Sequence, residues 1–155
     1  MTPAFAEAPD QFTVLAWRDP VVERLGHRPG SPYVEAVWLG VLGPSTTLAW
    51  ARLARVAATV ERASVDVTDL SVSLGLGESL GRNATITRTL NRMVSFGAAQ
   101  RTGDTLAVRL ALPDLPERAV GRLSLSARLA HEHLAHHRRT PTVDAVPVPS
   151  MGVQL

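Results

Sequence analysis

Two threonines and two arginines recur at helical spacing between residues 83 and 99. Thr85, Arg88, Thr89 and Arg92 fall at i, i+3, i+4 and i+7, so they share one face of a helix. A guanidinium can donate two parallel hydrogen bonds to guanine or to a phosphate, and a threonine can bond a phosphate or touch a thymine methyl group. This face is therefore predicted to contact DNA. The alternative is an ordinary solvated helix surface.

An apolar stripe accompanies the Arg/Thr face. Its members are Ile86, Leu90, Met93 and Val94. The centres of the two stripes lie about 135° apart on a helix, so one can be buried while the other stays accessible. We predict a helix over residues 83–96, with Asn83 as its N-cap and Gly97 in the left-handed conformation after its last turn.

A basic hairpin is predicted directly after this helix, over residues 98–112. Gly103 and Asp104 form a two-residue turn, and leucine and valine alternate with polar or small residues from Thr105 onward. Arg101 lies beside the turn and Arg109 falls on the outward-facing set of positions. A hairpin in this place would act as a wing that contacts the DNA backbone.

The helix and hairpin together resemble the recognition helix and wing of winged helix-turn-helix proteins, bacterial transcription regulators of the multiple-antibiotic-resistance type among them. The matching residues are Ala84, Thr85, Arg88, Leu90, Met93, Val94, Gly97, Ala98 and Ala99. The resemblance extends over roughly residues 45–137. It implies a mainly α (α+β) fold, binding of double-stranded DNA and transcription regulation, although winged helices also serve as protein-interaction modules.

The preceding segment fits the first helix of a helix-turn-helix. We expect a helix over residues 67–76, capped by Asp66 or Thr68, and then a glycine-rich connection over residues 75–82. This connection, which includes Arg82, either touches the DNA backbone or is a spacer. A nucleotide-phosphate loop is disfavoured, because it requires a lysine and the chain contains none.

The rest of the chain is predicted to add an arm and helices before this unit and a tail after it. Residues 1–18 read as an N-terminal arm and residues 140–155 as a flexible tail, so the winged domain with its helical extension spans residues 19–139. Helices are expected over residues 20–25 and 33–42, and from Ser45 to about Ala63.

A long C-terminal helix is predicted over residues 116–137. Its apolar residues repeat at 3-4-3-4 spacing, which we call the heptad seam: Val120, Leu123, Ala127, Ala130 and Leu134. The seam either pairs two copies of the chain into a homodimer or packs on its own domain. A homodimer would present two recognition helices to a palindromic site.

Charge and composition narrow the function further. The net charge is only +2, yet residues 79–112 carry five arginines against one aspartate, a local surplus of +4. Cysteine is absent, no catalytic constellation is visible, and no enzyme activity or cofactor is expected. The histidines of residues 131–137 are interpreted as a solvated helix end rather than a metal site. With no targeting segment and no apolar run long enough to span a bilayer, a soluble cytoplasmic protein is expected.

The sequence thus predicts a double-stranded DNA-binding regulator. The alternatives are a winged-helix protein-interaction module and a regulator that responds to a small molecule. The residues expected to contact DNA are Arg82, Thr85, Arg88, Thr89, Arg92, Arg101 and Arg109.

Overall fold

The computed structural model describes residues 4–139, with side chains through Ala135. The predicted tail, residues 140–155, and the side chains of residues 136–139 lie outside the described residues. The described chain is an α+β fold with a four-stranded mixed sheet. In chain order its elements are β1 (Gln11–Trp17), α1 (Pro20–Leu25), the π-helical turn η1 (Val34–Trp38), α2 (Leu39–Leu42), α3 (Pro44–Thr59), β2 (Ala63–Asp66), α4 (Val67–Ser73), α5 (Thr85–Ser95), β3 (Ala99–Thr102), β4 (Thr105–Arg109), α6 (Glu117–Val120) and α7 (Leu125–Arg139).

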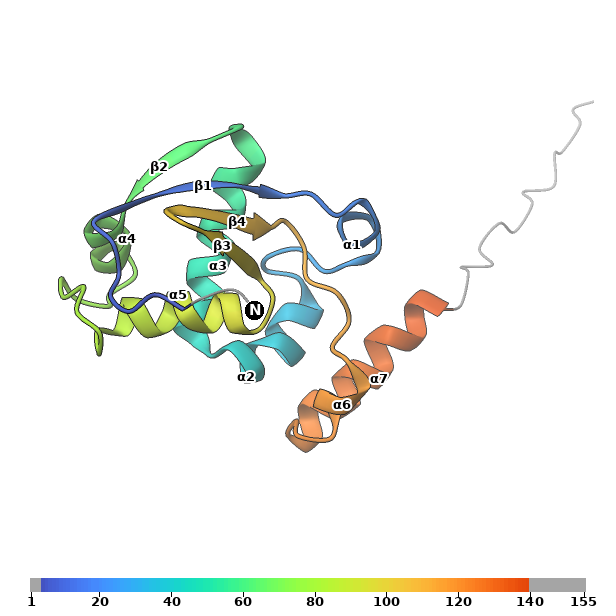
Figure 1. The fold of residues 1–155 in the computed structure, drawn as a ribbon. Coiled ribbons are helices and arrows are strands. Elements are labelled where there is room, and N and C mark those ends of the chain that lie inside the picture. The colour runs from blue at the N-terminus through green and yellow to red at the C-terminus, as the bar shows by residue number, and fades with distance from the viewer. Residues whose placement is uncertain (1–3, 140–155) are drawn as a thin grey trace, which may run out of the picture.

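The sheet is built around its most N-terminal strand. Its order is β2-β1-β4-β3, with β1 antiparallel to β2 and parallel to β4 (Figure 1). Phe12 and Val14 alternate with more exposed neighbours and are buried, which is the pattern of a strand with one face on the core. The segment expected as an N-terminal arm, residues 1–18, therefore contains β1, which lies between β2 and β4 in the sheet.

Helices α3 and α5 cover the inner face of the sheet. Trp50 of α3 is fully buried, and its indole N–H donates to the Arg109 carbonyl at the end of β4 over 2.9 Å. Helix α3 begins at Pro44, which needs no backbone N–H in the first turn. It ends at Thr59, earlier than the predicted Ala63, because residues 63–66 pair with β1 as strand β2.

The two helices that were predicted to form the helix-turn-helix are present with slightly different limits. Asp66 caps α4 by accepting from the Asp69 amide at 2.8 Å, and Gly75 follows the C-cap residue Leu74 at φ 74°. Helix α5 begins one residue after Ala84, whose side chain cannot cap it, so Asn83 is not its N-cap as predicted. Gly97 follows α5 at φ 74°, which confirms the predicted left-handed end.

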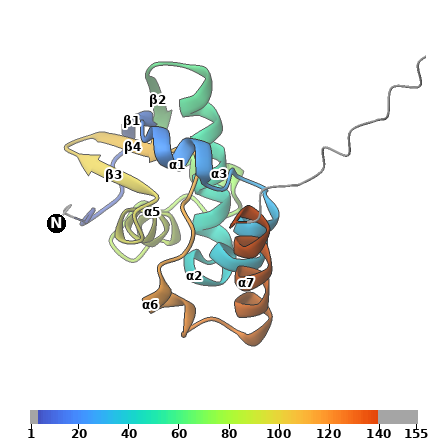
Figure 2. The same ribbon diagram turned by 90° about the vertical axis from the view of Figure 1, so that its right-hand side faces the viewer.

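The predicted helix over residues 116–137 is divided in two. Helix α6 ends before Gly121, and α7 begins after Ser124, whose hydroxyl accepts from the Ala127 amide at 3.2 Å as an N-cap does. Figure 2 shows α7 lying beside α2 and the neighbouring N-terminal segment. This placement agrees with the packing of α7 against η1.

Candidate nucleic-acid interface

Helix α5 is held to the core by a fully apolar face. Ile86, Leu90 and Met93 have no exposed surface, as the sequence predicts. Burying three large apolar side chains fixes the rotation of the helix about its axis, since any other rotation would expose them. The residues on the opposite face are therefore presented in a defined direction.

A second flank of α5 is covered by the N-terminal segment. The Asn91 amide group accepts from the Phe5 N–H at 2.6 Å and donates to the Phe5 carbonyl at 2.9 Å. The Ala8 N–H donates to the Thr87 hydroxyl at 3.2 Å. Residues near the N-terminus thus lie along α5, as Figure 1 also shows. These long-range contacts leave one flank and the outer face of the helix open.

The open flank borders a shallow groove between α5 and the first turn of α3. The groove has a volume of about 240 Å³, and residues on both sides of it include Thr85, Arg88 and Arg92 from α5 and Ser45 from α3. No local sequence pattern indicates that residues 43–46 lie beside α5. Only the packing of α3 against α5 brings the two segments together.

The two arginines of the groove differ in their surroundings. Arg92 donates to the Val41 carbonyl at 2.8 Å and lies over the Phe96 ring at 5.6 Å, although its side chain stays exposed. Arg88 is exposed and, within the described part of the chain, has no hydrogen-bond or ion-pair partner. Arg88 is therefore the cation of α5 most available to an anionic ligand.

The two threonines also differ. Thr85 is half-buried at the groove. Thr89 is only 4% exposed, so it packs beneath the surface. Thr89 also lines the groove with Thr85, and its contact with DNA stays a prediction.

Arg101 of the hairpin is engaged within the chain. Its guanidinium donates to the Ala4 carbonyl at 2.9 Å and to the Gly103 carbonyl at 3.0 Å, and it lies over the Phe5 ring at 4.0 Å. These contacts hold the N-terminal segment against the hairpin. They take Arg101 out of the proposed interface, in contrast to the sequence prediction.

Arg109 is likewise used inside the fold. It lies over the Trp17 ring at 3.7 Å, donates to the Gly97 carbonyl at 2.9 Å and pairs with Asp19 at 3.1 Å. The pKa of Asp19 lies below its usual value, because the carboxylate accepts from the Val22 amide and from Arg109. Arg109 therefore joins β1, α1 and β4, and it does not point outward to DNA as predicted.

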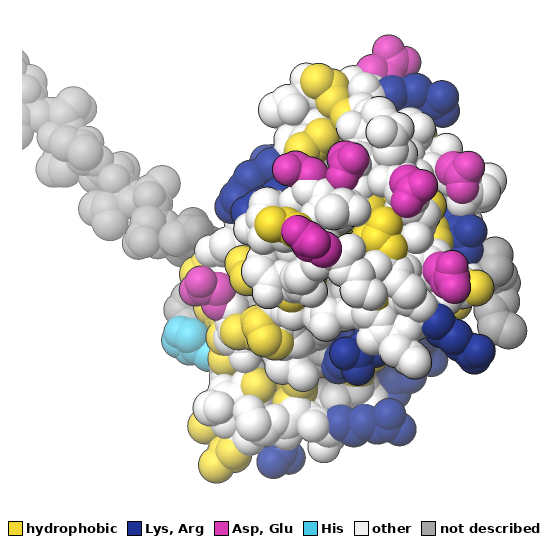
Figure 3. Space-filling model, turned by 90° about the vertical axis from the view of Figure 1, so that its left-hand side faces the viewer, with side chains coloured by type: hydrophobic (Ala, Val, Ile, Leu, Met, Phe, Trp, Pro, Cys, Tyr) yellow, Lys and Arg dark blue, Asp and Glu magenta, His cyan; other side chains and the backbone are white. Residues whose placement is uncertain are grey.

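Arg82 remains exposed in the connection before α5, and no acidic residue lies within α5. Figure 3 shows the corresponding side of the molecule. Acidic side chains lie in its upper and middle parts together with several arginines, whereas its lower part shows arginines without acidic side chains. The lower part of this side is thus locally basic on a protein whose net charge is only +2.

The heptad seam packs on its own domain. Ala127 is buried, and Val120, Leu123, Ala130 and Leu134 are partly buried against the core. The Tyr33 hydroxyl shares a 2.6 Å hydrogen bond with His131 Nδ1 and accepts from the Leu115 amide at 2.8 Å. The Tyr33 ring also stacks on His27, whose Nε2 lies 2.6 Å from an Asp114 oxygen. The sequence pattern predicted a solvated helix end over residues 131–137, whereas His131 is buried.

Two further findings bear on the class of protein. Among the described residues, no three His, Asp or Glu side chains come together as they would around a metal ion. No helix in the described part is both long enough and apolar enough to cross a membrane.

The chain was compared with known proteins at the level of sequence and structure. No family model, curated protein or solved structure matches it.

Proposed function

We propose that the chain is a winged helix-turn-helix protein that binds double-stranded DNA through α5 and regulates transcription. Three helices followed by a hairpin, with strand β2 between the first two helices (α3-β2-α4-α5-β3-β4), agree with the order of helices and wing that the resemblance implies. The observation that carries the proposal is the exposed, unpaired guanidinium of Arg88 on a helix whose orientation is fixed by its buried face. A helix presented in this way fits the width of the major groove.

The proposed contacts are fewer than the sequence suggests. Arg88 reads a base, by preference guanine, and Arg92 and Thr85 contact the edges of the groove or adjacent phosphates. Arg82 contacts a phosphate from the connection before α5. The hairpin takes a supporting part in this scheme, since both of its arginines are bound within the fold.

Pairing into a homodimer belongs to the proposal as well. The heptad seam is occupied by the chain's own core, so the outer face of α7 would have to supply the contact. Leu125 and Leu129 lie one turn apart on this face and are 66% and 56% exposed. Two copies would place two α5 helices on a palindromic site.

The proposal is tested by fluorescence anisotropy with fragmented genomic duplex DNA over a range of salt concentrations. The Arg88→Ala/Arg92→Ala variant should bind at least tenfold more weakly at low salt and show a shallower salt dependence, because two phosphate or base contacts are lost. The matched control is Arg24→Ala/Arg62→Ala, which removes the same charge from exposed positions outside α5 and α7. Equal losses in the two variants would contradict a specific role for α5.

One observation favours a second candidate, a protein-interaction module. Both arginines of the hairpin are bound within the described part of the fold, so the hairpin offers its polar side chains and backbone N–H groups rather than a guanidinium to a DNA backbone. Absence of salt-dependent DNA binding by the parent protein would support this candidate, and the Arg88 surface would then be the region to test against protein partners.

A further inference from the structure

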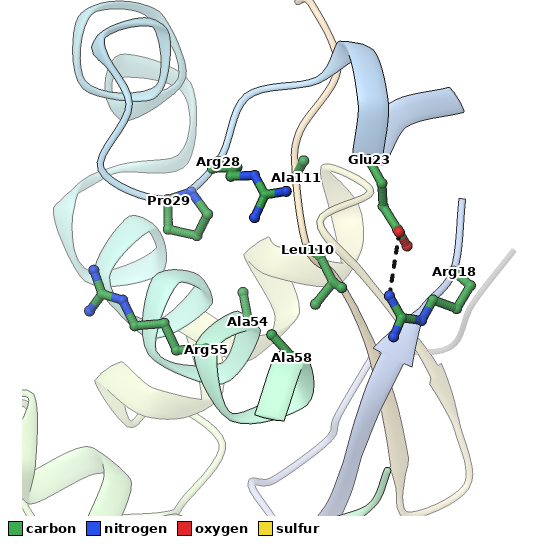
Figure 4. A pocket seen from close by; sticks show the side chains of 9 residues that line it. All are labelled: Arg18, Glu23, Arg28, Pro29, Ala54, Arg55, Ala58, Leu110 and Ala111. Carbon is green, nitrogen blue, oxygen red and sulfur yellow. Dashed lines mark hydrogen bonds and ion pairs between the residues drawn. The ribbon is translucent and has the colours of Figure 1, made fainter. Parts of the chain in front are cut away.

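We propose that a cavity on the far half of α3 binds a small organic anion with a compact apolar body. The cavity has a volume of about 280 Å³ and is lined by residues of β1's end, α1, the loop after α1, α3 and the segment after β4 (Figure 4). It shares no lining residue with the groove beside α5. Along α3 the two sites are separated by about ten residues, or roughly 15 Å.

Three arginines from separate parts of the chain border this cavity. Arg28 extends across its middle, and Arg18 and Arg55 flank it from opposite sides (Figure 4). One acidic residue, Glu23, lines the same cavity and pairs with Arg18 at 3.4 Å. Arg28 and Arg55 have no partner within the described part of the chain. Two cations near one small cavity therefore remain without a counter-charge.

The floor of the cavity is apolar. The surface beneath the arginines is formed by Ala54 and Ala58 of α3 and by Leu110 and Ala111, which directly follow β4. A charged rim over an apolar floor suits a ligand with two chemically different ends, since water is displaced from the floor while the anion bonds a guanidinium. A free phosphate ion would use the rim alone.

The size of the cavity limits the ligand. Benzene fills an engineered apolar cavity of about 150 Å³, and drug-sized ligands occupy about 300 Å³ or more. At 280 Å³ the cavity holds roughly one ring with a carboxylate or phosphate group attached. None of its lining residues lines the groove beside α5, so the site is distinct from the proposed DNA interface.

Isothermal titration calorimetry of the full chain tests this inference without DNA. The compounds are benzoate, phenyl phosphate, inorganic phosphate and benzyl alcohol. Inorganic phosphate lacks the ring, and benzyl alcohol lacks the charge. We expect benzoate or phenyl phosphate to bind at least tenfold more tightly than both partial compounds. Binding should also raise the melting temperature, because the ligand binds only the folded state.

Two variants separate the charge from the floor. Arg28→Ala/Arg55→Ala removes two exposed side chains and should weaken binding about tenfold or more. Ala58→Leu keeps every charge, sits at an exposed helical position and fills the cavity, so it should weaken binding comparably. The control Arg62→Ala/Arg128→Ala should stay within about twofold of the parent.

The outcomes are distinguishable from those of the DNA experiment. Binding that is lost equally in Arg28→Ala/Arg55→Ala and in the control would reflect general charge and would overturn the inference. Unchanged binding in Ala58→Leu, or no binding of either aromatic anion at millimolar concentration, would also overturn it. Each of these results leaves the role of Arg88 untouched.

Discussion

The arginines of residues 79–112 have the same side-chain chemistry, but the groups around them in the fold differ. Arg88 and Arg82 lie exposed, whereas Arg101 and Arg109 are bound to groups from the first 20 residues of the chain. The partners of Arg109 and Arg101 lie 90 and 97 positions away. Spacing within a helix or hairpin cannot reveal such partners. The sequence therefore could not show that the two wing arginines are bound within the fold, whereas the contact of the exposed Arg88 with DNA stays a prediction.

Arg109→Ala should destabilise the fold, because the Arg109 side chain is bound within it. The substitution removes the stacking on Trp17 and leaves the Gly97 carbonyl without its donor. We expect the free energy of unfolding to fall by about 1–3 kcal/mol, measured by urea denaturation followed by tryptophan fluorescence. Arg88→Ala is the matched control and should change it by less than about 0.5 kcal/mol. Equal effects would show that Arg109 is not structural.

Asp19 should contribute stability that depends on pH. Its pKa is lowered in the folded protein below the usual 3.8 by the Val22 amide and then by Arg109. The contribution is fully present above the unfolded value and is lost as the pH falls through the folded value, because protonation ends both interactions. Urea denaturation between pH 6 and about pH 2.5 should thus show a smaller acid-side loss for Asp19→Asn than for the parent. An identical pH dependence of the two proteins would contradict the assignment.

Helices and hairpins that depend on adjacent residues were predicted correctly, whereas a strand that depends on distant partners was not. Helix α5, its glycine end, α4 and the β3–β4 hairpin follow from capping, periodicity and turn chemistry in adjacent residues. Strand β1 was missed, although Phe12 and Val14 have the alternation of a strand, because its partners in the sheet lie 49 to 55 positions away in β2 and 92 positions away in β4. The heptad pattern continued across Gly121 and hid the break between α6 and α7, which Ser124 marks by its cap.

The attachment of α7 depends on Tyr33. Tyr33→Phe removes the oxygen that accepts from the Leu115 amide and bonds His131. We expect unfolding to become easier by about 1–3 kcal/mol and hydrogen exchange to accelerate over residues 125–135 more than over α5. Glu132→Gln, an exposed change on the same helix, is the control. Unchanged exchange in α7 would show that this helix is held by its apolar contacts alone.

The whole molecule presents two basic surfaces of different form. One is the shallow groove beside α5 around Arg88, and the other is a small cavity around Arg28 on the far half of α3. Helix α3 is common to both, since its first turn borders the groove and its second half lines the cavity. The charge pattern predicted the basic segment over residues 79–112. It did not predict the second basic surface, because the arginines of the cavity are residues 18, 28 and 55, far apart in the sequence and outside that segment.

The most direct test of the central claim is to map the DNA-contacting surface by nuclear magnetic resonance. Backbone amide shifts of the labelled protein would be followed while duplex DNA is added at low salt. The account predicts that the largest changes fall on residues 82–92 and 43–46, with little change at Ala58 and Leu110. Changes centred on the cavity or on α7, or no changes at all, would contradict the assignment of α5 as a DNA-reading helix.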